Sequence, residues 1–371
     1  MRFETEEAKE NPSDFLNGVE VHGGDGADAI TGGTGESVLD GGRGNDLLTG
    51  RGDHDTFLAS SHRDGADTLV LQSGSGSLVD YTRRRRPVRL SLDEHRNDGE
   101  EGEHDRLVSR GAGVTLAGGR GADRLYAGRN YHRSPAEFNG VSLIGNRGAD
   151  VLVGNSAANS LYADGNERGA LRDRDRLYGR GGSDLLYGNS GPNLLDGGAG
   201  PDLVWAGAGA DLIRLRGRDL DGVSCGAGHD RARLDALDSL SSRASCERID
   251  RGSSAIATFD AFSESAGSSR EVLADERRFY VDIACPTDAG RRCRGQVLMR
   301  YRSTVLARGS FSIHRGGDGQ PTLKLTRAGI RKFVDGGAYI KTTLEIRSHD
   351  RWGRLRISRV GGWLSYLQGD V

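Results

Sequence analysis

Single apolar residues recur every nine positions through long stretches of this chain, each two places after an Asp, Asn or Ser. Four such units follow one another from Gly23 and read GGDGADAIT, GGTGESVLD, GGRGNDLLT and GRGDHDTFL. The unit returns at 118–126, 145–153 and 154–162, and five more copies run from 170 to 214. Recurrence at a fixed period predicts a repeat architecture, in which each unit packs mainly against its neighbours.

Each nonapeptide has residues suited to a turn followed by a short strand. Glycines at positions one, two and four permit the positive φ angles of a tight turn. The last three residues indicate a strand with one inward apolar side chain, at position eight. Such a strand buries too little surface alone, so the strands are expected to stack as a parallel coil with two nonapeptides per coil. Repeats two apart then lie on the same side.

Position six carries the acidic residues of the repeat. It is occupied by Asp28, Asp46, Asp55, Asp123, Asp150, Asp175, Asp184, Asp202 and Asp211, and elsewhere by Ser37, Asn159 and Asn193. Stacked turns would align the carboxylates in columns, where they repel one another. A hard cation that accepts six to eight oxygens removes this conflict, and Ca²⁺ tolerates irregular geometry better than Mg²⁺. The pattern therefore predicts several Ca²⁺ sites, although not every turn is expected to hold metal.

The pattern resembles the RTX, or haemolysin-type calcium-binding, repeat family, whose signature is GGxGxDxUx with U apolar. The resemblance implies a right-handed parallel β-roll with Ca²⁺ held between turns n and n+2. Carried over to this chain, it pairs Asp28 with Asp46 and Asp184 with Asp202. It also implies carbonyl ligands, from Gly24, Gly26, Gly42 and Gly44 for the first pair and from Gly182, Gly198 and Gly200 for the second.

Other turns depart from the signature in ways that change the expected affinity. Asp175, Asn193 and Asp211 fall on the opposite side of the coil, where the neutral amide of Asn193 should weaken binding. Ser37, paired with Asp55 on one side of the coil, is a further departure, because position six there has a hydroxyl in place of a carboxylate.

Two further segments resemble parts of secreted actinobacterial-type RTX proteins. Residues 79–107 (VDYTRRRRPVRLSLDEHRNDGEEGEHDRL) look like an insert of those proteins, whose acidic turn is expected to hold one more ion. We interpret the run Arg83–Arg86 within it as a solvated loop rather than a contact for an anionic partner. Residues 225–249 resemble the cap of such rolls, which implies a disulfide between Cys225 and Cys246.

The cysteines bear on the cellular compartment. Cys225, Cys246, Cys285 and Cys293 fit no C-x-x-C metal or redox spacing, and two local disulfides are expected. Disulfides imply an oxidising, extracellular setting. The N-terminus, MRFETEEAKENPSDF, lacks the apolar segment of a secretion signal. Export therefore uses another signal, or this start lies inside a longer gene product, and we favour the second.

The pattern changes after residue 252. Residues 253–271 are rich in Ser and Ala and are interpreted as a linker. Residues 272–371 alternate with period two, which predicts a small antiparallel β-sandwich-like domain whose last short strand holds Leu355 and Ile357. Residues 1–21 form an N-terminal segment. The roll is expected over 22–252, with repeat tracts at 22–58 and 118–224.

Composition excludes several classes of protein. Of 371 residues, 51 are Lys or Arg and 53 are Asp or Glu, so the net charge of −2 argues against a nucleic-acid-binding protein. No apolar run approaches the length of a membrane span. The stretch Gly222–Gly226 matches G-x-S-x-G, but it lies in a glycine-rich repeat rather than between a buried strand and a helix, so we expect no catalytic site.

These inferences predict an all-β, secreted, non-catalytic protein with several Ca²⁺ ions as cofactors and a structural or surface role. An extracellular polysaccharide or protein at the cell surface would be its macromolecular partner. The alternative hypothesis is a calcium-binding accessory module of a larger extracellular enzyme, either polysaccharide-modifying or hydrolytic. The sequence before Met1 would separate the two.

Overall fold

The computed structural model describes most of the chain, with gaps. The described residues are 2–4, 19–71, 76–110, 113–128, 140–165, 173–215, 219–235, 238–240, 246–251, 258–259, 278–281, 283–285, 292–315, 318–319, 321–329, 331, 339–349 and 355–365. Most of the predicted N-terminal segment and of the predicted linker lies outside these ranges. The chain divides into two compact units, one made of Met1–Gly198 with Trp205–Ile213 and the other of Ala199–Val204 with Arg214–Val371.

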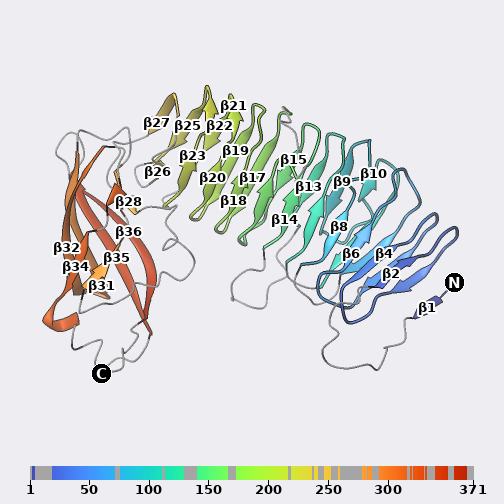
Figure 1. Cartoon of the computed structure of the whole chain (residues 1–371), viewed down its shortest axis with the longest axis horizontal. Coiled ribbons are helices and arrows are strands. Elements are labelled where there is room, and N and C mark those ends of the chain that lie inside the picture. Colours follow the sequence, from blue (N-terminus) through green and yellow to red (C-terminus); the bar gives the residue numbers. More distant parts are fainter. Residues whose placement is uncertain are drawn as a thin grey trace. The chain divides into compact units, whose positions relative to one another are not determined.

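The first unit is built from short parallel strands stacked in sheets (Figure 1). One sheet runs in the order β2 (Val19–His22), β4 (Ser37–Asp40), β6 (Thr56–Leu58), β8 (Leu78–Asp80), β12 (Thr115–Ala117), β14 (Ser142–Ile144), β16 (Ser160–Tyr162) and β18 (Leu185–Tyr187). A second contains β1 (Arg2–Glu4), β3 (Ala29–Thr31), β5 (Leu47–Gly50), β7 (Thr68–Leu71) and β11 (Arg106–Ser109). A third contains β9 (Val88–Ser91), β13 (Arg124–Tyr126), β15 (Val151–Val153), β17 (Arg176–Gly181), β19 (Leu194–Ala199) and β22 (Leu212–Arg214).

The apolar residue of each repeat points into the roll. Position eight is paired with position eight of the next coil, as Leu39 is with Phe57 and Phe57 with Val79. These side chains are at most 2% exposed at Ile30, Leu39, Leu48, Phe57, Val79, Leu116, Leu125, Leu143, Leu152, Leu161, Leu177 and Leu186. The predicted parallel β-roll, with one inward apolar column per sheet, is therefore confirmed.

The insert interrupts one side of the roll and leaves the sheet of β8 and β12 continuous. Strands β8 and β12 pair in parallel with each other and with the coils on either side, whereas β11 pairs in parallel with β7 and ends the sheet that contains it. A separate sheet begins with β10 (Gly99–Glu100), which pairs antiparallel with β9. The parallel stack thus joins the two repeat tracts.

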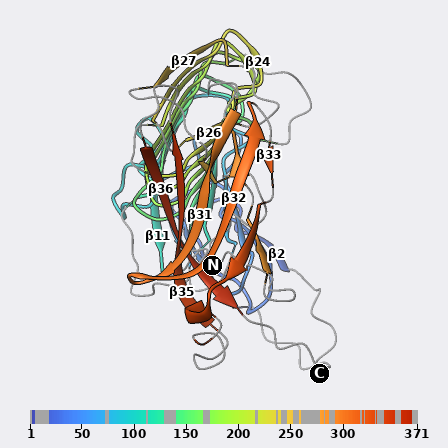
Figure 2. The same ribbon diagram turned by 90° about the vertical axis from the view of Figure 1, so that its left-hand side faces the viewer.

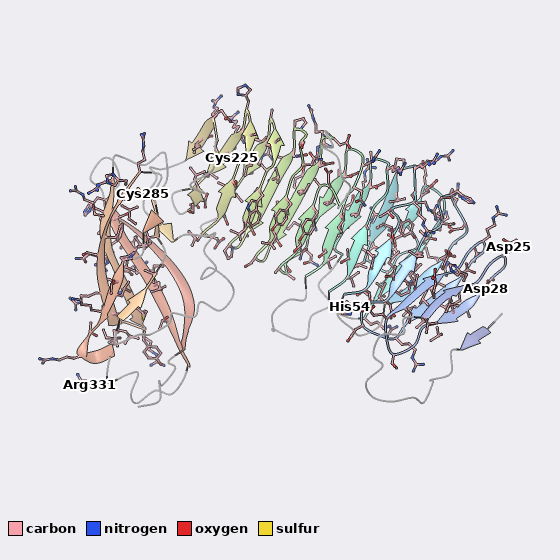
Figure 3. All side chains as sticks on the ribbon, viewed as in Figure 1. Asp25, Asp28, His54, Cys225, Cys285 and Arg331 are labelled. Atoms are coloured by element: carbon pink, nitrogen blue, oxygen red, sulfur yellow. A yellow bond between two sulfur atoms is a disulfide. The ribbon has the colours of Figure 1, made fainter. Side chains whose placement is uncertain are left out.

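The second unit contains the last coils and the C-terminal domain. Its strands β20 (Leu203–Trp205), β23 (Gly222–Ser224) and β26 (Ser239–Leu240) are neighbours in that order, and β25 (Arg231–Leu234) pairs in parallel with β27 (Arg248–Arg251). The disulfide Cys225–Cys246 joins residues within this cap, as expected, and Cys285–Cys293 is formed in the C-terminal domain. Figure 3 labels Cys225 and Cys285.

The C-terminal domain is antiparallel, as predicted. A six-stranded sheet runs in the order β29 (Arg278–Tyr280), β34 (Thr322–Leu325), β32 (Thr304–His314), β31 (Arg292–Tyr301), β35 (Tyr339–His349) and β36 (Leu355–Ser365). A three-stranded sheet contains β28 (Thr258–Phe259), β30 (Ile283–Ala284) and β33 (Asp318–Gly319). Side chains of both sheets, among them Ile283, Val297, Met299, Leu323 and Ile346, form one buried core.

One expectation for this domain was wrong. The last strand is not short, because β36 spans eleven residues. Leu355 and Ile357 are 52% and 37% exposed and do not contribute to the core. Among the described residues, no helix is long and apolar enough to cross a membrane.

Candidate metal-binding turns

Turns that are two repeats apart lie in direct contact. A Cβ atom added to Gly44 would lie 1.7 Å from the carbonyl oxygen of Gly26, and one added to Gly42 would lie 2.1 Å from that of Gly24. Both Gly42 and Gly44 also have positive φ, 88° and 142°. Only glycine permits this approach, which places the four predicted carbonyl donors of the first site in two adjacent turns.

The position-six carboxylates form the predicted columns, linked through the backbone. The Asp28 N–H donates to Oδ1 of Asp46 at 2.8 Å, and the Asp46 N–H donates to Oδ1 of Asp67 at 2.8 Å. In a second column, the Asp123 N–H donates to Asp150 Oδ1 at 2.7 Å and the Asp150 N–H donates to Asp175 Oδ1 at 2.8 Å. Each carboxyl group therefore satisfies one backbone donor of the preceding coil.

Burial makes the charge on these carboxylates costly. Asp123, Asp150 and Asp175 are each 0% exposed. Desolvation raises the pKa of Asp123 and of Asp175 to about 7. It raises the pKa of Asp150 to about 9, with a further contribution from repulsion by Asp123, Asp175 and Asp173. Carboxylates in this condition are stabilised either by a proton or by a cation.

The second carboxylate oxygen separates the aspartate turns into two kinds. Oδ2 of Asp55 accepts from the Gly52 N–H at 3.0 Å, and Oδ2 of Asp123 accepts from the Gly119 N–H at 2.6 Å. Oδ2 of Asp46 and Oδ2 of Asp150 are buried and have no hydrogen-bond donor among the described residues. An unsatisfied buried oxygen of an ionised group is unfavourable, so these two turns favour a counter-ion.

At Asn193 the amide nitrogen Nδ2 takes the place of the carboxylate oxygen Oδ2. Asn193 Oδ1 accepts from the Asp175 N–H at 3.0 Å, in the role that Oδ1 has in Asp46. Its Nδ2 donates to the carbonyl oxygen of Gly191 at 2.9 Å and to Oδ1 of Asn189 at 3.0 Å. The amide hydrogens thus satisfy the carbonyl of position four, which a carboxylate cannot do.

The same contact recurs at the other neutral position-six residues. Asn159 Nδ2 donates to the Ala157 carbonyl at 2.8 Å, and Ser37 Oγ donates to the Gly35 carbonyl at 3.4 Å. The position-four carbonyl therefore faces the side chain of position six in all three neutral turns. An ionised Asp has no hydrogen to donate to this carbonyl, and a turn that offers only oxygen acceptors suits a hard cation.

The donor set fits calcium rather than a softer metal. No group of three or more His, Cys, Asp or Glu side chains in the described part of the chain could hold a metal by itself. Backbone carbonyls must therefore supply much of any coordination shell, together with one or two carboxylates. Oxygen-only donors of mixed charge are the ligands that Ca²⁺ takes.

Comparison with known families agrees with this geometry. The family model of the RTX calcium-binding nonapeptide repeat matches residues 22–57, 104–130, 142–166, 170–195 and 187–217. The chain is an RTX-type repeat protein. Its RTX repeats indicate calcium binding and a structural β-roll. Among curated proteins, no match to the chain is found.

The structure of this RTX protein brings some predicted site residues together. Asp28 and Asp46 lie in adjacent turns, as do Ser37 and Asp55, whose Oδ1 accepts from the Ser37 N–H at 3.0 Å. Asn193 and Asp211 are linked in the same way at 2.7 Å. The predicted turn glycines have positive φ at Gly24, Gly26, Gly42, Gly44, Gly182, Gly198 and Gly200. Their roles as calcium ligands stay predictions.

The second predicted RTX pair falls across the division of the chain. Asp184 belongs to the first compact unit and Asp202 to the second, so their joint site stays a prediction. Within its own unit, Asp184 Oδ1 accepts from the Asn159 N–H at 2.8 Å, and burial raises the pKa of Asp184 to about 7. Asp202 donates its N–H to Oδ1 of Asp221 at 2.8 Å.

Sequence reasoning missed three carboxylates of the RTX columns. Asp67, Asp105 and Asp221 are buried, and each accepts a backbone N–H of the preceding coil through Oδ1. Their repeats lack the glycine signature or differ in length. The signal that could have found them is an Asp two residues before a buried apolar residue, as in Asp67-x-Leu69 and Asp221-x-Val223.

The basic run in the insert of this RTX protein is not wholly solvated, and the interpretation was wrong at Arg84. Its side chain is 0% exposed, and its NH2 lies 2.7 Å from Asp64 Oδ1 and 2.7 Å from Glu103 Oε1. NH1 lies 3.5 Å from Glu100 Oε1. Here a guanidinium of the chain itself supplies the positive charge for a buried group of carboxylates.

Proposed function

We propose that this RTX protein is an extracellular, non-catalytic calcium-binding protein whose roll folds when its aspartate turns fill with Ca²⁺. At least the turns of Asp46 and Asp150 would hold ions. Each ion would add positive charge beside a buried carboxylate oxygen, and carbonyls of the adjacent turn would complete its coordination. The protein would serve as a structural or surface component outside the cell.

One contrast carries this proposal. In the part of the chain that the structure describes, the buried Oδ2 atoms of Asp46 and Asp150 have no hydrogen-bond donor, whereas the amide of Asn193 donates to the carbonyl of its own turn. The two aspartate turns therefore lack positive charge in a place where the asparagine turn supplies hydrogen-bond donors. A cation bound only in the folded state stabilises that state, so folding and metal binding are coupled.

Two observations support an extracellular location. Both disulfides are formed, and disulfides persist in oxidising compartments. Calcium sites of extracellular modules have dissociation constants on the order of 10⁻⁴–10⁻³ M, which fill outside the cell and stay empty in the cytosol. A roll built on such sites would remain unfolded until export.

The absence of catalysis is supported by the setting of Ser224. It is the last residue of β23, and the next residue, Cys225, is bonded to Cys246. A nucleophile elbow requires a sharp turn from a strand into a helix, whereas β24 (Ala227–Gly228) and β25 follow here. Ser224 therefore has the surroundings of a strand residue in a roll.

The test is a calcium titration of the full chain after EGTA treatment, followed by circular dichroism and thermal unfolding. We expect a cooperative gain of β-structure and of Tm with Ca²⁺ at sub-millimolar to millimolar concentration, and little gain with Mg²⁺. The double variant Asp46→Ala, Asp150→Ala should respond weakly. Equal structure and Tm in EGTA and in Ca²⁺ would refute the proposal.

A further inference from the structure

The outer face of the six-stranded C-terminal sheet carries a concentrated positive charge. Residues alternate between the core and the outer face along β31, where Cys293, Val297 and Met299 are buried in the core while Arg294 and Gln296 are exposed; Leu298, in the outward row, is also buried. Residues opposite one another on neighbouring strands lie on the same face of the sheet, so the pairing identifies the outward residues of the other strands. Leu298 is opposite Arg308 on one side and Glu345 on the other, and Glu345 is opposite Arg359.

At the described outward positions of β31, β32, β34, β35 and β36, cations far outnumber anions. The cations are Arg292, Arg294, Arg300, Arg308, Lys324, Arg347 and Arg359. Glu345 is the single carboxylate among these positions. This contrasts with the whole chain, whose net charge is −2. Figure 2 shows β31, β32 and β36 as long strands of this sheet.

Glu345 shows that the face is organised to bind carboxylates. Its side chain is 2% exposed, and Oε1 accepts from Arg347 Nε at 2.7 Å while Oε2 accepts from Arg359 Nε at 2.7 Å. Arg300 Nε lies 3.6 Å from Oε2. One carboxylate is thus shared by three guanidinium groups, which leaves the face with excess positive charge and holds two arginines in fixed positions.

Polar side chains lie between the cations, while Leu355 and Ile357 on the edge strand β36 add an exposed apolar margin to the face. Gln296, Ser310 and Ser312 are exposed on this face, and Thr343 is half-buried. Hydroxyl and amide groups of this kind exchange hydrogen bonds with sugar hydroxyls.

We propose that this face, defined by the outward positions of β31, β32, β34, β35 and β36, binds a linear carboxylated polysaccharide. Guanidinium groups match carboxylates in charge and in fork geometry, and the serine, threonine and glutamine side chains match the hydroxyls. Neighbouring strands lie about 4.8 Å apart, so an extended chain of sugar acids would cross several of these positive side chains. The site is independent of calcium binding by the roll.

The test uses oligogalacturonate as the probe and the full chain in calcium-replete buffer. We expect saturable binding that weakens with salt, and no binding of neutral dextran. The triple variant Arg294→Glu, Arg308→Glu, Lys324→Glu should bind about tenfold more weakly, because its substitutions reverse three exposed charges without touching the Glu345 cluster. Circular dichroism should show that this variant keeps the wild-type fold.

A matched control reverses three exposed arginines of the roll, in the variant Arg83→Glu, Arg85→Glu, Arg86→Glu. It changes the net charge equally and should bind oligogalacturonate within about twofold of wild type, because exposed rim charges act locally at moderate salt. Equal losses in both variants would overturn the proposal, since binding would then follow net charge. Tighter binding of single-stranded DNA or of phosphatidylserine vesicles would overturn it in favour of another polyanion.

Discussion

The turns that end at Asp46 and at Asn193 have the same backbone hydrogen bond at position six. They differ in what lies beside the second polar atom of that side chain. In each, Oδ1 of position six accepts an N–H of the preceding coil, from Asp28 and from Asp175. The other side-chain atom is a donor in Asn193, bonded to the Gly191 carbonyl, and an unsatisfied buried acceptor in Asp46. One turn is complete in itself, and the other requires a proton or a cation.

Repeats with the same backbone can therefore differ in the group that stabilises their buried oxygens. The insert adds a third solution, because the guanidinium of Arg84 lies among Asp64, Glu100 and Glu103. Amide, guanidinium and external cation all place positive charge or hydrogen-bond donors beside buried oxygens. An amide or a guanidinium makes the stability of the turn independent of calcium, whereas an external cation makes it depend on the calcium concentration.

The largest expected effect is a reversal of the pH dependence of stability by calcium. The folded-state pKa values are about 7 for Asp123, about 8 for Asp221 and about 9 for Asp150, against an ordinary value of 3.8. Groups with raised pKa values bind more protons in the folded state. In EGTA, stability should therefore fall as pH rises from about 4 to about 9, by several kcal/mol in total.

With saturating Ca²⁺ the sign should reverse, because protons then compete with the metal for the same carboxylates. Thermal unfolding of the full chain across this pH range, in EGTA and in Ca²⁺, measures both slopes. Parallel slopes under the two conditions would contradict the assignment of the buried carboxylates to metal.

The second prediction concerns the internal cation. Arg84→Met should destabilise the roll by about 3–5 kcal/mol, because it leaves the buried carboxylates of Asp64 and Glu103 without a counter-charge. Calcium should not restore the full loss, because an ion does not reproduce the contacts of the guanidinium with both Asp64 and Glu103. Chemical denaturation in Ca²⁺ measures the change, with the exposed neighbour in Arg83→Met as a control expected within about 0.5 kcal/mol of wild type. Equal effects of the two variants would show that Arg84 is not a buried ion-pair partner.

Third, Asn193→Asp should convert the self-sufficient turn into a metal-requiring one. In EGTA the variant should lose about 1–3 kcal/mol, because a carboxylate would face the Gly191 carbonyl and Asn189 Oδ1 without a hydrogen to donate. Ca²⁺ should recover most of this loss. Asn193→Ser is the matched control, since Ser37 already donates to a position-four carbonyl in this roll. A loss in EGTA that calcium leaves unchanged would argue against an ion in such turns.

Fourth, Asp46→Asn should stabilise the roll in EGTA, and this change in stability should be the smallest of the four. An amide at this position can donate to the turn as Asn193 does, so stability in EGTA should rise by about 0.5–1.5 kcal/mol while the calcium response falls. Asp123→Asn is the contrasting control, because Oδ2 of Asp123 already accepts from the Gly119 N–H and an amide would put two donors together. The distinction between the two aspartate turns would be lost if both variants gained stability equally.

Much of the roll could be predicted from the sequence because its information is local. The position-eight column, the turn glycines with positive φ and the same-side pairing of Asp28 with Asp46 all follow from the nine-residue period. The C-terminal antiparallel strands follow from alternation, as at Val297 and Met299. Prediction failed at Asp67 and Asp105, where the nine-residue period breaks, and for the last strand β36, which was expected to be short and spans eleven residues.

The sequence by itself determined the period, the strands and the side of the coil on which each carboxylate lies, since these depend on spacing along one chain. Only the tertiary structure decided which carboxylates have a donor for their second oxygen, as Asp123 has in Gly119 and Asp46 lacks. It also decided that Arg84 is buried among residues up to 20 positions away. Burial and the pKa values that follow from it depend on neighbours that only the stacking of coils brings together.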